Sequence, residues 1–416
     1  MGRPDPFAPG VYAGALMELP GVGPAAVRWA VERFGSPRAA WEADAEAWSA
    51  DPLLSGTARA SLRSRRDPRA LGRLARALER CRARAITPWD DAAARQAWRL
   101  PIYPSNLLAL PDPPVVLYVR GSLWPDDRVA VAVVGSRNAD VSGLMAAEKL
   151  ATGLAEWGFT IVSGLATGID GAAHQAALRV KGRTVAVLGC GIDRVYPREH
   201  ERLARQVEAA GALISEYPPG TPVDRWRLAR RNYVIAGLSL GVVVVEARAR
   251  SGALSTAEMA DALSRAVLVT PGDITRSTTV GSNRLLADGA TPCTQPGDVA
   301  VHALDTLKLL EGPQALERLA AAGEPATAGG PEGRWGRLLN RLAERDAPSR
   351  PPSPAELAPA LRAVWDVLSK GPMDVDELSY RADLAVQPLL ARLTELEAGG
   401  YVRRLMDGRW ARRRLG

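Results

Sequence analysis

The feature that most constrains the fold is a series of short, valine-rich runs between residues 96 and 310. The runs are "RVAVAVVGS", "GFTIVSG", "RTVAVLGCG", "GALISEY", "LGVVVVEA" and "AVLVTPG". They do not alternate, which is typical of strands buried on both faces. Because helical stretches such as "GLMAAEKLATGLAEWG" separate them, they predict an α/β fold with a doubly wound, mostly parallel sheet. Ligands of such sheets bind at the carboxyl ends of the strands, so we expect the functional residues there.

Composition divides the 416-residue chain into four zones. Residues 1–95 have a helical pattern rich in arginine, and residues 96–310 carry the predicted sheet. Residues 311–357, with "AAAGEPATAGGPEG" and "RDAPSRPPSPAE", have the composition of a flexible linker. Residues 358–416 have the pattern of a small compact domain. The sequence therefore predicts three folded domains, with a linker before the last one.

The chain has a formal net charge of +7, and nearly all of its cations are arginine. A basic balance favours an anionic partner, nucleic acid first. A GC-rich genome and solvated surface arginines would give the same composition, so charge alone leaves both interpretations open. The sequence has no apolar run long enough to span a bilayer and no secretion signal at its N-terminus, which predicts no membrane insertion. Three distant cysteines without a CxxC pair favour a reducing cytoplasm.

The first predicted strand ends in Gly135-Ser136-Arg137. A tight turn before a helix leaves backbone N–H groups free, and the helix dipole adds partial positive charge. An arginine adds a full charge and a fork of donors that suits phosphate. The three residues are therefore a candidate anion site, although a glycine after a strand is common by itself.

The second predicted strand leads into "SGLATGIDGAAHQ", residues Ser163–Gln175. Its glycines allow a ligand to approach the backbone, but their spacing is neither that of a dinucleotide fingerprint nor that of a P-loop. We expect Asp170 to cap the helix that follows. His174 has no companion ligands at metal-binding spacing, so we expect a core histidine.

After the fourth predicted strand, "DRWRLARRNYVIAGLS" interleaves arginines with aromatic rings. Charges that follow phosphates and rings that stack on bases suit a single nucleic-acid strand, and a solvated helix face is the alternative. Later strands end near Ser251-Gly252 and in Pro271-Gly272-Asp273. Several donor-rich turns at one sheet edge point to a polyanion site. The candidate residues of the arginine-rich segment are Arg225, Trp226, Arg230, Arg231 and Asn232.

Catalytic motifs are missing from the sequence. It has no acid pair spaced for general acid–base work, no GxSxG elbow and no HExxH pair, and Glu246 is a lone acid at a strand end. We therefore predict a protein that is not an enzyme, without catalytic residues, metal or cofactor.

Eight segments resemble, in order, those of the DNA-processing protein A family, also called DprA/Smf: "VAVVGSR", "IVSGLATGIDGAAHQAAL", "VLGCGIDRVYP", "LISEYPPG", "RRNYVIAGLS", "VVVVEARARSGALSTAEMA", "VTPGD" and "GSNRLLADGA". The resemblance covers roughly residues 100–295. It implies an extended Rossmann-like domain that binds single-stranded DNA, a homodimer, protection of incoming strands, and loading of the RecA recombinase during natural transformation. No catalytic activity is established as the role of this family.

The resemblance also implies a DNA-binding pocket at the strand ends. Gly135, Ser136 and Arg137 would hold phosphate there. The same groove would be lined by residues that match the other family motifs, namely Ser163, Gly164, Gly168, Arg231, Asn232, Ser251, Gly252 and Asn283.

The chain departs from the family pattern at two positions of the arginine-rich segment. Tyr233 stands where the family commonly has arginine, and Leu228 where it commonly has phenylalanine. Leucine has no π-face for a base. Trp226 lies two residues earlier, and Pro222 upstream favours a loop over a long helix. We therefore predict that Trp226 replaces the missing ring, with packing against protein as the alternative.

Both flanking zones resemble small helical modules. "LMELPGVGPAAVRWAVERFGS" resembles a helix-hairpin-helix or SAM-like unit, whose Leu19–Gly23 loop is either a phosphate site or an ordinary helix turn. Residues 358–416 resemble a winged helix, which some family members carry. Winged helices bind duplex DNA or protein, so duplex DNA is a further candidate partner. Arginines near the C-terminus slightly favour DNA: Arg403, Arg404, Arg409, Arg412, Arg413 and Arg414.

Two other functions compete with DNA binding. A nucleotide-cleaving phosphoribohydrolase of the lysine-decarboxylase-like group shares the Rossmann-like layout, but its PGGxGTxxE hallmark is replaced here by "ARARSGALSTAEMA". A regulatory protein whose sheet senses a small nucleotide is the other alternative. A binding assay with single-stranded DNA against free nucleotides separates the three.

Overall fold

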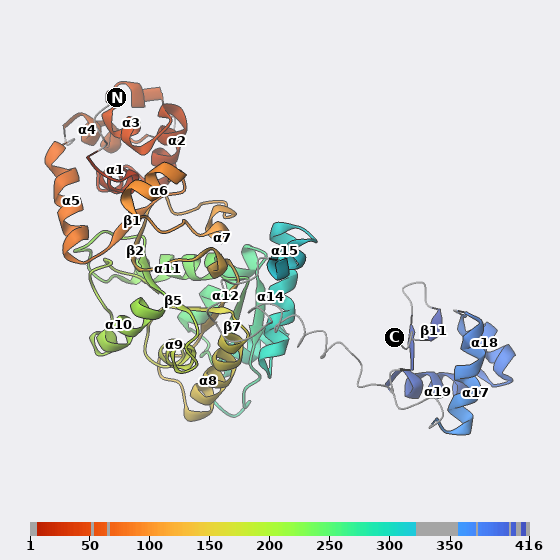
Figure 1. The fold of residues 1–416 in the computed structure, drawn as a ribbon. Helices are drawn as coiled ribbons and strands as arrows, with labels where there is room; N and C mark the ends of the chain where they lie inside the picture. The colour runs from red at the N-terminus through yellow and green to blue at the C-terminus, as the bar shows by residue number, and fades with distance from the viewer. Residues whose placement is uncertain are drawn as a thin grey trace. The chain divides into compact units, whose positions relative to one another are not determined.

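The computed structural model describes residues 6–50, 54–64, 67–321, 357–371, 373–398, 401–404 and 409–412 (Figure 1). The chain forms two compact units, Met1–Trp335 and Gly336–Gly416. The first unit holds the sheet and the N-terminal helices. Within the described residues, no helix combines the length and the apolar character that a membrane crossing requires.

All six predicted strands are present and belong to one sheet. They are β3 (Ala130–Val134), β4 (Thr160–Ser163), β5 (Thr184–Leu188), β6 (Ala212–Ser215), β7 (Gly241–Val244) and β8 (Ala266–Val269). They run parallel in the order β6-β5-β4-β3-β7-β8. Every residue of the first five is buried, because helices cover both faces of the sheet. The predicted α/β fold with a doubly wound, mostly parallel sheet is therefore confirmed.

Three short strands extend the sheet at its edges. β2 (Leu117–Gly121) pairs antiparallel with β6, β1 (Arg84–Ile86) pairs antiparallel with β2, and β9 (Thr291–Pro292) runs parallel to β8. The short helices α6 (Ala92–Trp98) and α7 (Ser105–Leu108) lie between β1 and β2 in sequence. The sequence had placed residues 84–86 in a separate helical domain. A three-residue strand is too short to give a recognisable pattern, which explains the difference.

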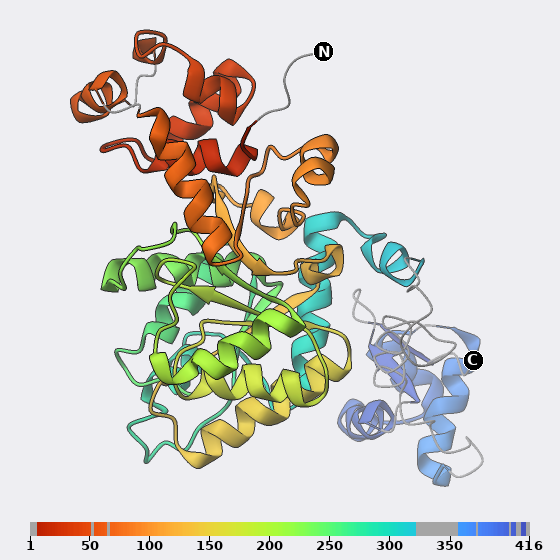
Figure 2. The ribbon, with the colours of Figure 1, turned by 60° about the vertical axis from the view of Figure 1, so that its left-hand side comes forward.

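The strand order reverses between β3 and β7. Helices α8 (Val141–Glu156), α9 (Ile169–Arg179) and α10 (Glu201–Ala210) pack in sequence along one face, and α14 (Pro296–Glu311) packs beside α8. Helices α11 (Arg225–Leu238) and α12 (Gly252–Ala262) pack together on the other face, and α13 (Val280–Ala287) follows β8 (Figures 1 and 2). The chain therefore leaves β3 and β7 toward opposite faces, which opens a crevice at their carboxyl ends.

The N-terminal zone is helical, as predicted, with α1 (Pro9–Met17), α2 (Pro24–Phe34), α3 (Pro37–Glu42), α4 (Gly56–Ser64) and α5 (Pro68–Arg80). Helix α1 packs on β1, so these helices and the sheet form one compact unit. In the Leu19–Gly23 loop, Leu19 and Val22 are buried. A Cβ at Gly21 would crowd the backbone of Ala58 in α4. The loop is packed against α4, which favours an ordinary helix turn.

The zone expected to be a linker begins with ordered structure. Helix α14 continues to Glu311, and α15 (Ala315–Ala321) buries Ala315 and Leu319 against its neighbours. The linker prediction is therefore wrong for residues 315–321, because the apolar residues of "PQALERLAA" sit at helical spacing and are buried. Residues 322–356 of that prediction lie outside the described residues.

The C-terminal unit contains α17 (Pro359–Val367), α18 (Val375–Ala382) and α19 (Val386–Ala398), followed by a hairpin of β10 (Val402–Arg404) and β11 (Trp410–Arg412). Its core includes Val364, Leu378 and Leu393. Three helices and a hairpin make the predicted winged-helix arrangement. Arg412, one of the arginines expected to favour DNA, stacks on Trp365 at 3.3 Å from the ring centroid and pairs with Asp366 at 3.2 Å. Arg412 therefore has partners within its own domain.

Candidate nucleic-acid interface

A cavity of about 570 Å³ lies at the carboxyl ends of the strands, where the strand order reverses. The loops after β3, β4 and β7 form part of its wall, together with the start of α9, the segment of α11 from Arg225 to Ile235 and the first turn of α12. This is where a doubly wound sheet is expected to bind its ligand.

The turn after β3 contributes to the cavity through a side chain more than through its backbone. Ser136 donates its N–H to Glu246 O at 2.7 Å, so this donor is not available to a phosphate. Helix α8 begins only at Val141, and Asp140 already caps it by accepting the Gly143 N–H at 2.8 Å. The N–H groups of Ser136 and Gly143 are therefore occupied. Gly135 and Ser136 line the cavity, and Arg137 adds an exposed guanidinium that can bind an anion.

Ser163, Gly164 and Gly168, which were expected to line the groove after β4, pack against protein behind the cavity wall. Ser163 is fully buried and donates its hydroxyl to Val133 O at 2.7 Å. A Cβ at Gly164 would overlap the Arg231 guanidinium, so only glycine fits there. Gly168 has a φ of +74° and packs against the Ser136 carbonyl, where a side chain has no room. None of the three lines the cavity, which is lined instead by Ala166 of this loop and by Asp170 at the start of α9.

Asp170 and Arg231 are two buried residues of opposite charge beneath the cavity. Asp170 is the second residue of α9, so the prediction that it caps this helix is wrong: the capping position is Gly168. Its Oδ2 accepts the Gly164 N–H at 3.1 Å, while Arg231, only 6% exposed, donates to Gly164 O at 2.5 Å and Val187 O at 2.9 Å. Burial raises the pKa of Asp170, and the positive charge of Arg231 opposes that rise. Arg231 therefore contributes to the cavity floor, although its charge is partly compensated.

His174 is a core histidine, as predicted. It is fully buried, and its Nδ1 lies 2.7 Å from Thr184 Oγ1, which itself donates to Ile161 O. Burial lowers its pKa to about 3, so the ring is neutral. Among the described residues, no group of three or more histidine, cysteine or acidic side chains is placed to hold a metal ion.

The arginine-rich segment is a regular helix, so the expectation of a loop at Trp226 is wrong. Asp224 caps α11 by accepting the Trp226 N–H at 3.2 Å, and Pro222 precedes this cap, where a proline does not disturb the helix. Arg225, Leu228 and Asn232, at helical spacing, face the cavity. Trp226 points to another face and does not line the cavity. Leu228 packs over Gly189, so the position of the usual aromatic ring is aliphatic here.

Two other candidates in this helix have different roles. Arg230 pairs with Glu216 and Asp112, both at 3.2 Å, and lies over the Tyr233 ring. It does not line the cavity. Asn232 does, and its amide donates to Gly252 O at 3.2 Å, which joins α11 to α12 across the cavity wall.

The loop after β7 supplies two cations that the sequence interpretation missed. Arg248 and Arg250 are exposed and line the cavity beside Ser251 and Gly252. Ser251 caps α12 through the Ala253 N–H at 3.3 Å, and the space beside Gly252 is open. Both arginines could have been predicted from the sequence, because "RAR" stands directly before the Ser-Gly pair.

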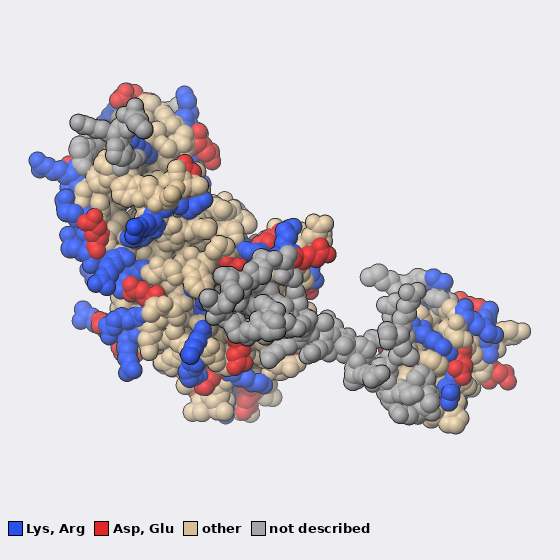
Figure 3. Space-filling model, viewed as in Figure 1, with Lys and Arg blue, Asp and Glu red and all other residues tan. Residues whose placement is uncertain are grey.

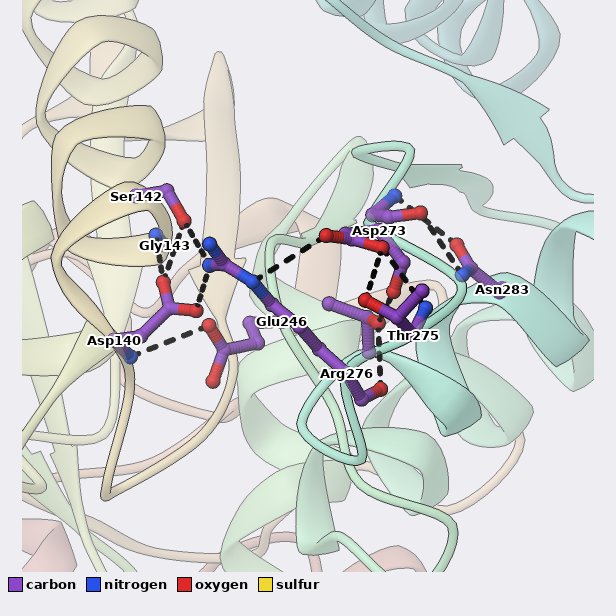
Figure 4. A network of polar contacts seen from close by, with 10 residues as sticks. Asp140, Ser142, Gly143, Glu246, Asp273, Thr275, Arg276 and Asn283 are labelled. Atoms are coloured by element: carbon purple, nitrogen blue, oxygen red, sulfur yellow. Dashed lines mark hydrogen bonds and ion pairs between the residues drawn. The ribbon is translucent and has the colours of Figure 1, made fainter.

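Asn283 belongs to a polar network outside the cavity (Figure 4). Its amide exchanges two hydrogen bonds of 3.0 Å with the backbone of Gly272. In the same loop, Arg276 binds Asp140 and donates to Ser142 at 2.8 Å. The network fastens the loop after β8 to the start of α8, and Asn283 holds this loop by its bonds to Gly272.

The cavity gathers exposed arginines from separate elements around one hollow. Lysine and arginine also cover other parts of the molecule, including the region of α5 (Figure 3). Around the cavity, four arginines are exposed and take part in no ion pair among the described residues: Arg137, Arg225, Arg248 and Arg250. Asp170 is the single acid of the cavity lining, and Arg231 partly neutralises it. The cavity therefore carries excess positive charge suited to a polyanion.

Comparison with known proteins places the chain in a family. Residues 97–303 match the family described as DNA recombination-mediator protein A, and residues 348–408 match the DprA winged helix domain. The Protein Smf of Synechocystis is 35% identical over 327 residues, which cover 75% of this chain and 78% of the relative. The chain belongs to the DNA recombination-mediator protein A family, as its sequence motifs predicted.

A solved structure supports the same assignment. The crystal structure of DNA processing protein A from Streptococcus pneumoniae is 31% identical in sequence, with a TM-score of 0.55. The match covers 70% of this chain and 97% of that one. The Rossmann-like fold and the C-terminal winged helix are thus those of the family. The phosphoribohydrolase alternative is not favoured.

Proposed function

We propose that this protein binds single-stranded DNA in the cavity between β3 and β7 and acts as a recombination mediator. In this role it protects incoming strands and loads the RecA recombinase during natural transformation, as a cytoplasmic homodimer. The proposal needs no cofactor and no catalytic step.

The observation that carries the proposal is the set of four exposed, unpaired arginines around the cavity. A guanidinium without a carboxylate partner keeps its full charge for a phosphate. Four such groups on three separate elements would contact successive phosphates of one strand. Of the residues named from sequence motifs, Gly135, Ser136, Arg137, Arg225, Arg231, Asn232, Ser251 and Gly252 line this cavity and are our proposed contacts.

The shape of the site favours a single strand over a duplex. Proteins that recognise duplex DNA usually insert a helix or a ribbon into a groove. Here the basic residues surround a hollow of about 570 Å³, a size that admits a nucleotide-sized group. A flexible strand can bend its backbone into such a hollow, whereas a stiff duplex would have to be distorted.

The direct test is equilibrium binding of the full chain to a labelled oligonucleotide, followed by fluorescence anisotropy. We expect single strands to bind more tightly than a duplex of equal length and than free nucleotides, with little sequence preference. The double variant Arg248→Ala/Arg250→Ala should bind on the order of tenfold more weakly, with a salt slope smaller by roughly 1.4, because two phosphate contacts are lost.

The matched control is Arg284→Ala, which removes an exposed arginine of α13 that does not line the cavity. It should bind like the wild type. Equal binding by the double variant and the wild type would place the site elsewhere, and absence of single-strand binding by the wild type would refute the proposal.

The finer role is tested separately. RecA assembly on single-stranded DNA covered by a single-strand-binding protein should accelerate when the chain is added, and the double variant should fail to accelerate it. The solution mass of the chain should be that of a dimer. A monomer mass, or no effect on RecA, would reduce the proposal to single-strand binding alone.

A further inference from the structure

A small aromatic cluster lies beside the cavity without lining it. It consists of Tyr217, Trp226 and Arg227, which we name the aromatic platform. Trp226 is 57% exposed at the second position of α11, and its neighbour Arg225 lines the cavity. The platform therefore begins where the cavity wall ends.

The Trp226 ring is held in place, although it is exposed. It meets the Tyr217 ring edge-on, with centroids 5.9 Å apart and an interplanar angle of 90°. The Arg227 guanidinium lies 4.6 Å from the Trp226 centroid and 5.6 Å from that of Tyr217. Arg227 is itself fixed, because it donates to Pro222 O at 3.0 Å. A ring that is already oriented loses little conformational entropy when a ligand stacks on it.

The direction of Trp226 follows from the helix. Residues four apart share a face, and Arg230, four residues on, is bound by Glu216. Trp226 accordingly faces the loop after β6, where Tyr217 lies. The side of α11 that faces the cavity carries Leu228, and no aromatic side chain lines the cavity among the described residues. Stacking on an aromatic ring is therefore available beside the cavity and not within it.

We propose that the aromatic platform stacks a nucleobase of a strand that leaves the cavity past Arg225. The inference rests on the proposed single-strand binding and adds a second contact zone to it. An exposed indole offers a flat surface to any base, so the contact is tolerant of sequence. Arg227 has no carboxylate partner among the described residues, so its charge is available to the adjoining phosphate. The platform thus serves only strands long enough to reach beyond the cavity.

The test compares oligonucleotide lengths. Trp226→Ala should weaken binding of an oligonucleotide of about 16 nucleotides by roughly 5- to 150-fold, the range for loss of one base–aromatic stack. It should leave an oligonucleotide of about 4 nucleotides unaffected, because that strand is held in the cavity. Trp226→Phe should restore most of the affinity for the longer strand.

The control is Trp124→Ala. Trp124 is a second exposed tryptophan, 52% exposed, that also lies against an arginine, with Arg183 at 3.8 Å from its centroid. It lies outside the cavity lining, at the amino ends of the strands. This variant should bind both lengths like the wild type.

A second measurement uses the wild-type protein and changes the DNA. Oligonucleotides with abasic sites outside the segment bound in the cavity should bind the wild type as weakly as the intact strand binds Trp226→Ala.

The outcomes separate this inference from the proposed function. If Trp226→Ala binds the longer strand normally while Arg248→Ala/Arg250→Ala does not, the cavity binds DNA and the platform does not. Equal losses for both lengths, or full affinity for the abasic strands, would also overturn the platform. If the wild type binds no single strand at all, the proposed function fails first.

Discussion

The two ends of the central sheet carry arginines in opposite states. At the amino ends, Arg183 binds Asp127 at 2.7 Å and Arg128 binds Glu311 at 2.5 Å. At the carboxyl ends, Arg137 and Arg248 take part in no ion pair among the described residues. The arginines at the two ends of the sheet therefore differ in whether they have an acidic partner.

The difference shows what each group of arginines can do. Asp127 and Arg183 are under 10% exposed in their side chains, and Arg183 also donates to Ser122 O at 2.9 Å. The cavity at this end, about 540 Å³, is lined mostly by apolar residues such as Tyr103 and Leu123. The paired arginines join segments of the fold, whereas the unpaired ones around the other cavity remain available to an anion. Four variants test this difference between the two ends.

The largest effect is expected at the amino ends. Arg183→Ala would leave Asp127 buried with the Thr160 hydroxyl, at 2.8 Å, as its remaining side-chain donor. Loss of one partner of a buried pair typically lowers the free energy of unfolding by about 3–5 kcal/mol. We expect this loss in chemical denaturation of the full chain, with unchanged affinity for single-stranded DNA under native conditions. A stable variant with weakened DNA binding would reverse the roles of the two ends.

The second effect is a pH dependence that belongs to the fold and not to the cavity. Burial lowers the pKa of His174 to about 3, whereas an unfolded histidine titrates near 6.5. Between these values the unfolded chain binds the proton and the folded chain does not. The free energy of unfolding therefore falls as the pH falls, by about 2 kcal/mol between pH 7 and pH 5 from this residue alone.

His174→Asn removes the titrating group and keeps an N–H donor near Thr184. The difference between wild type and variant isolates His174 from the buried acids, because those acids are common to both. The pH dependence of unfolding should be shallower in the variant over this range. The guanidinium groups of the cavity keep their charge at both pH values, so DNA affinity of the folded protein should not follow the histidine. Identical pH profiles for the two proteins would contradict the assignment.

The sequence predicts the fold better than the site, for a physical reason. A strand that is buried on both faces is a run of consecutive apolar residues, and such a run is visible in the sequence. The six apolar runs that begin with "RVAVAVVGS" therefore predict all six central strands. Pairing of charges is a long-range property: Asp127 lies 56 residues from Arg183. Nothing local distinguishes Arg183 from Arg137, or Arg230, which is paired, from Arg225, which is not.

The candidate site shows the same limit at single residues. The glycines after β3 and β4 were correctly singled out, but only the three-dimensional packing shows that Gly164 and Gly168 make room for Arg231 and Ser136 instead of a ligand. Asn283 bonds the backbone of Gly272, a contact that its sequence motif does not reveal. Arg248 directly follows the apolar run "LGVVVVEA", so its place at the sheet edge is predictable from the sequence, although the motif interpretation named only Ser251 and Gly252 beside it.

The smallest effect compares two arginines that flank the same strand. Arg128 precedes β3 and Arg137 follows it. Arg137→Ala should leave the free energy of unfolding within about 0.5 kcal/mol of the wild type, because an exposed side chain without an ion pair is removed. It should lower the salt slope of single-strand binding by roughly 0.7, the contribution of one phosphate.

Arg128→Ala, the matched control, should do the opposite. Its pair with Glu311 of α14 joins the start of β3 to the last helix of the sheet region, so the variant should be less stable and keep the full salt slope. The two measurements, denaturation and binding from low to high salt, are made on both variants. If both change the slope equally, the slope reports general surface charge. If Arg137→Ala leaves it unchanged, Arg137 is a solvated side chain, and pairing state alone does not identify the residues that bind DNA.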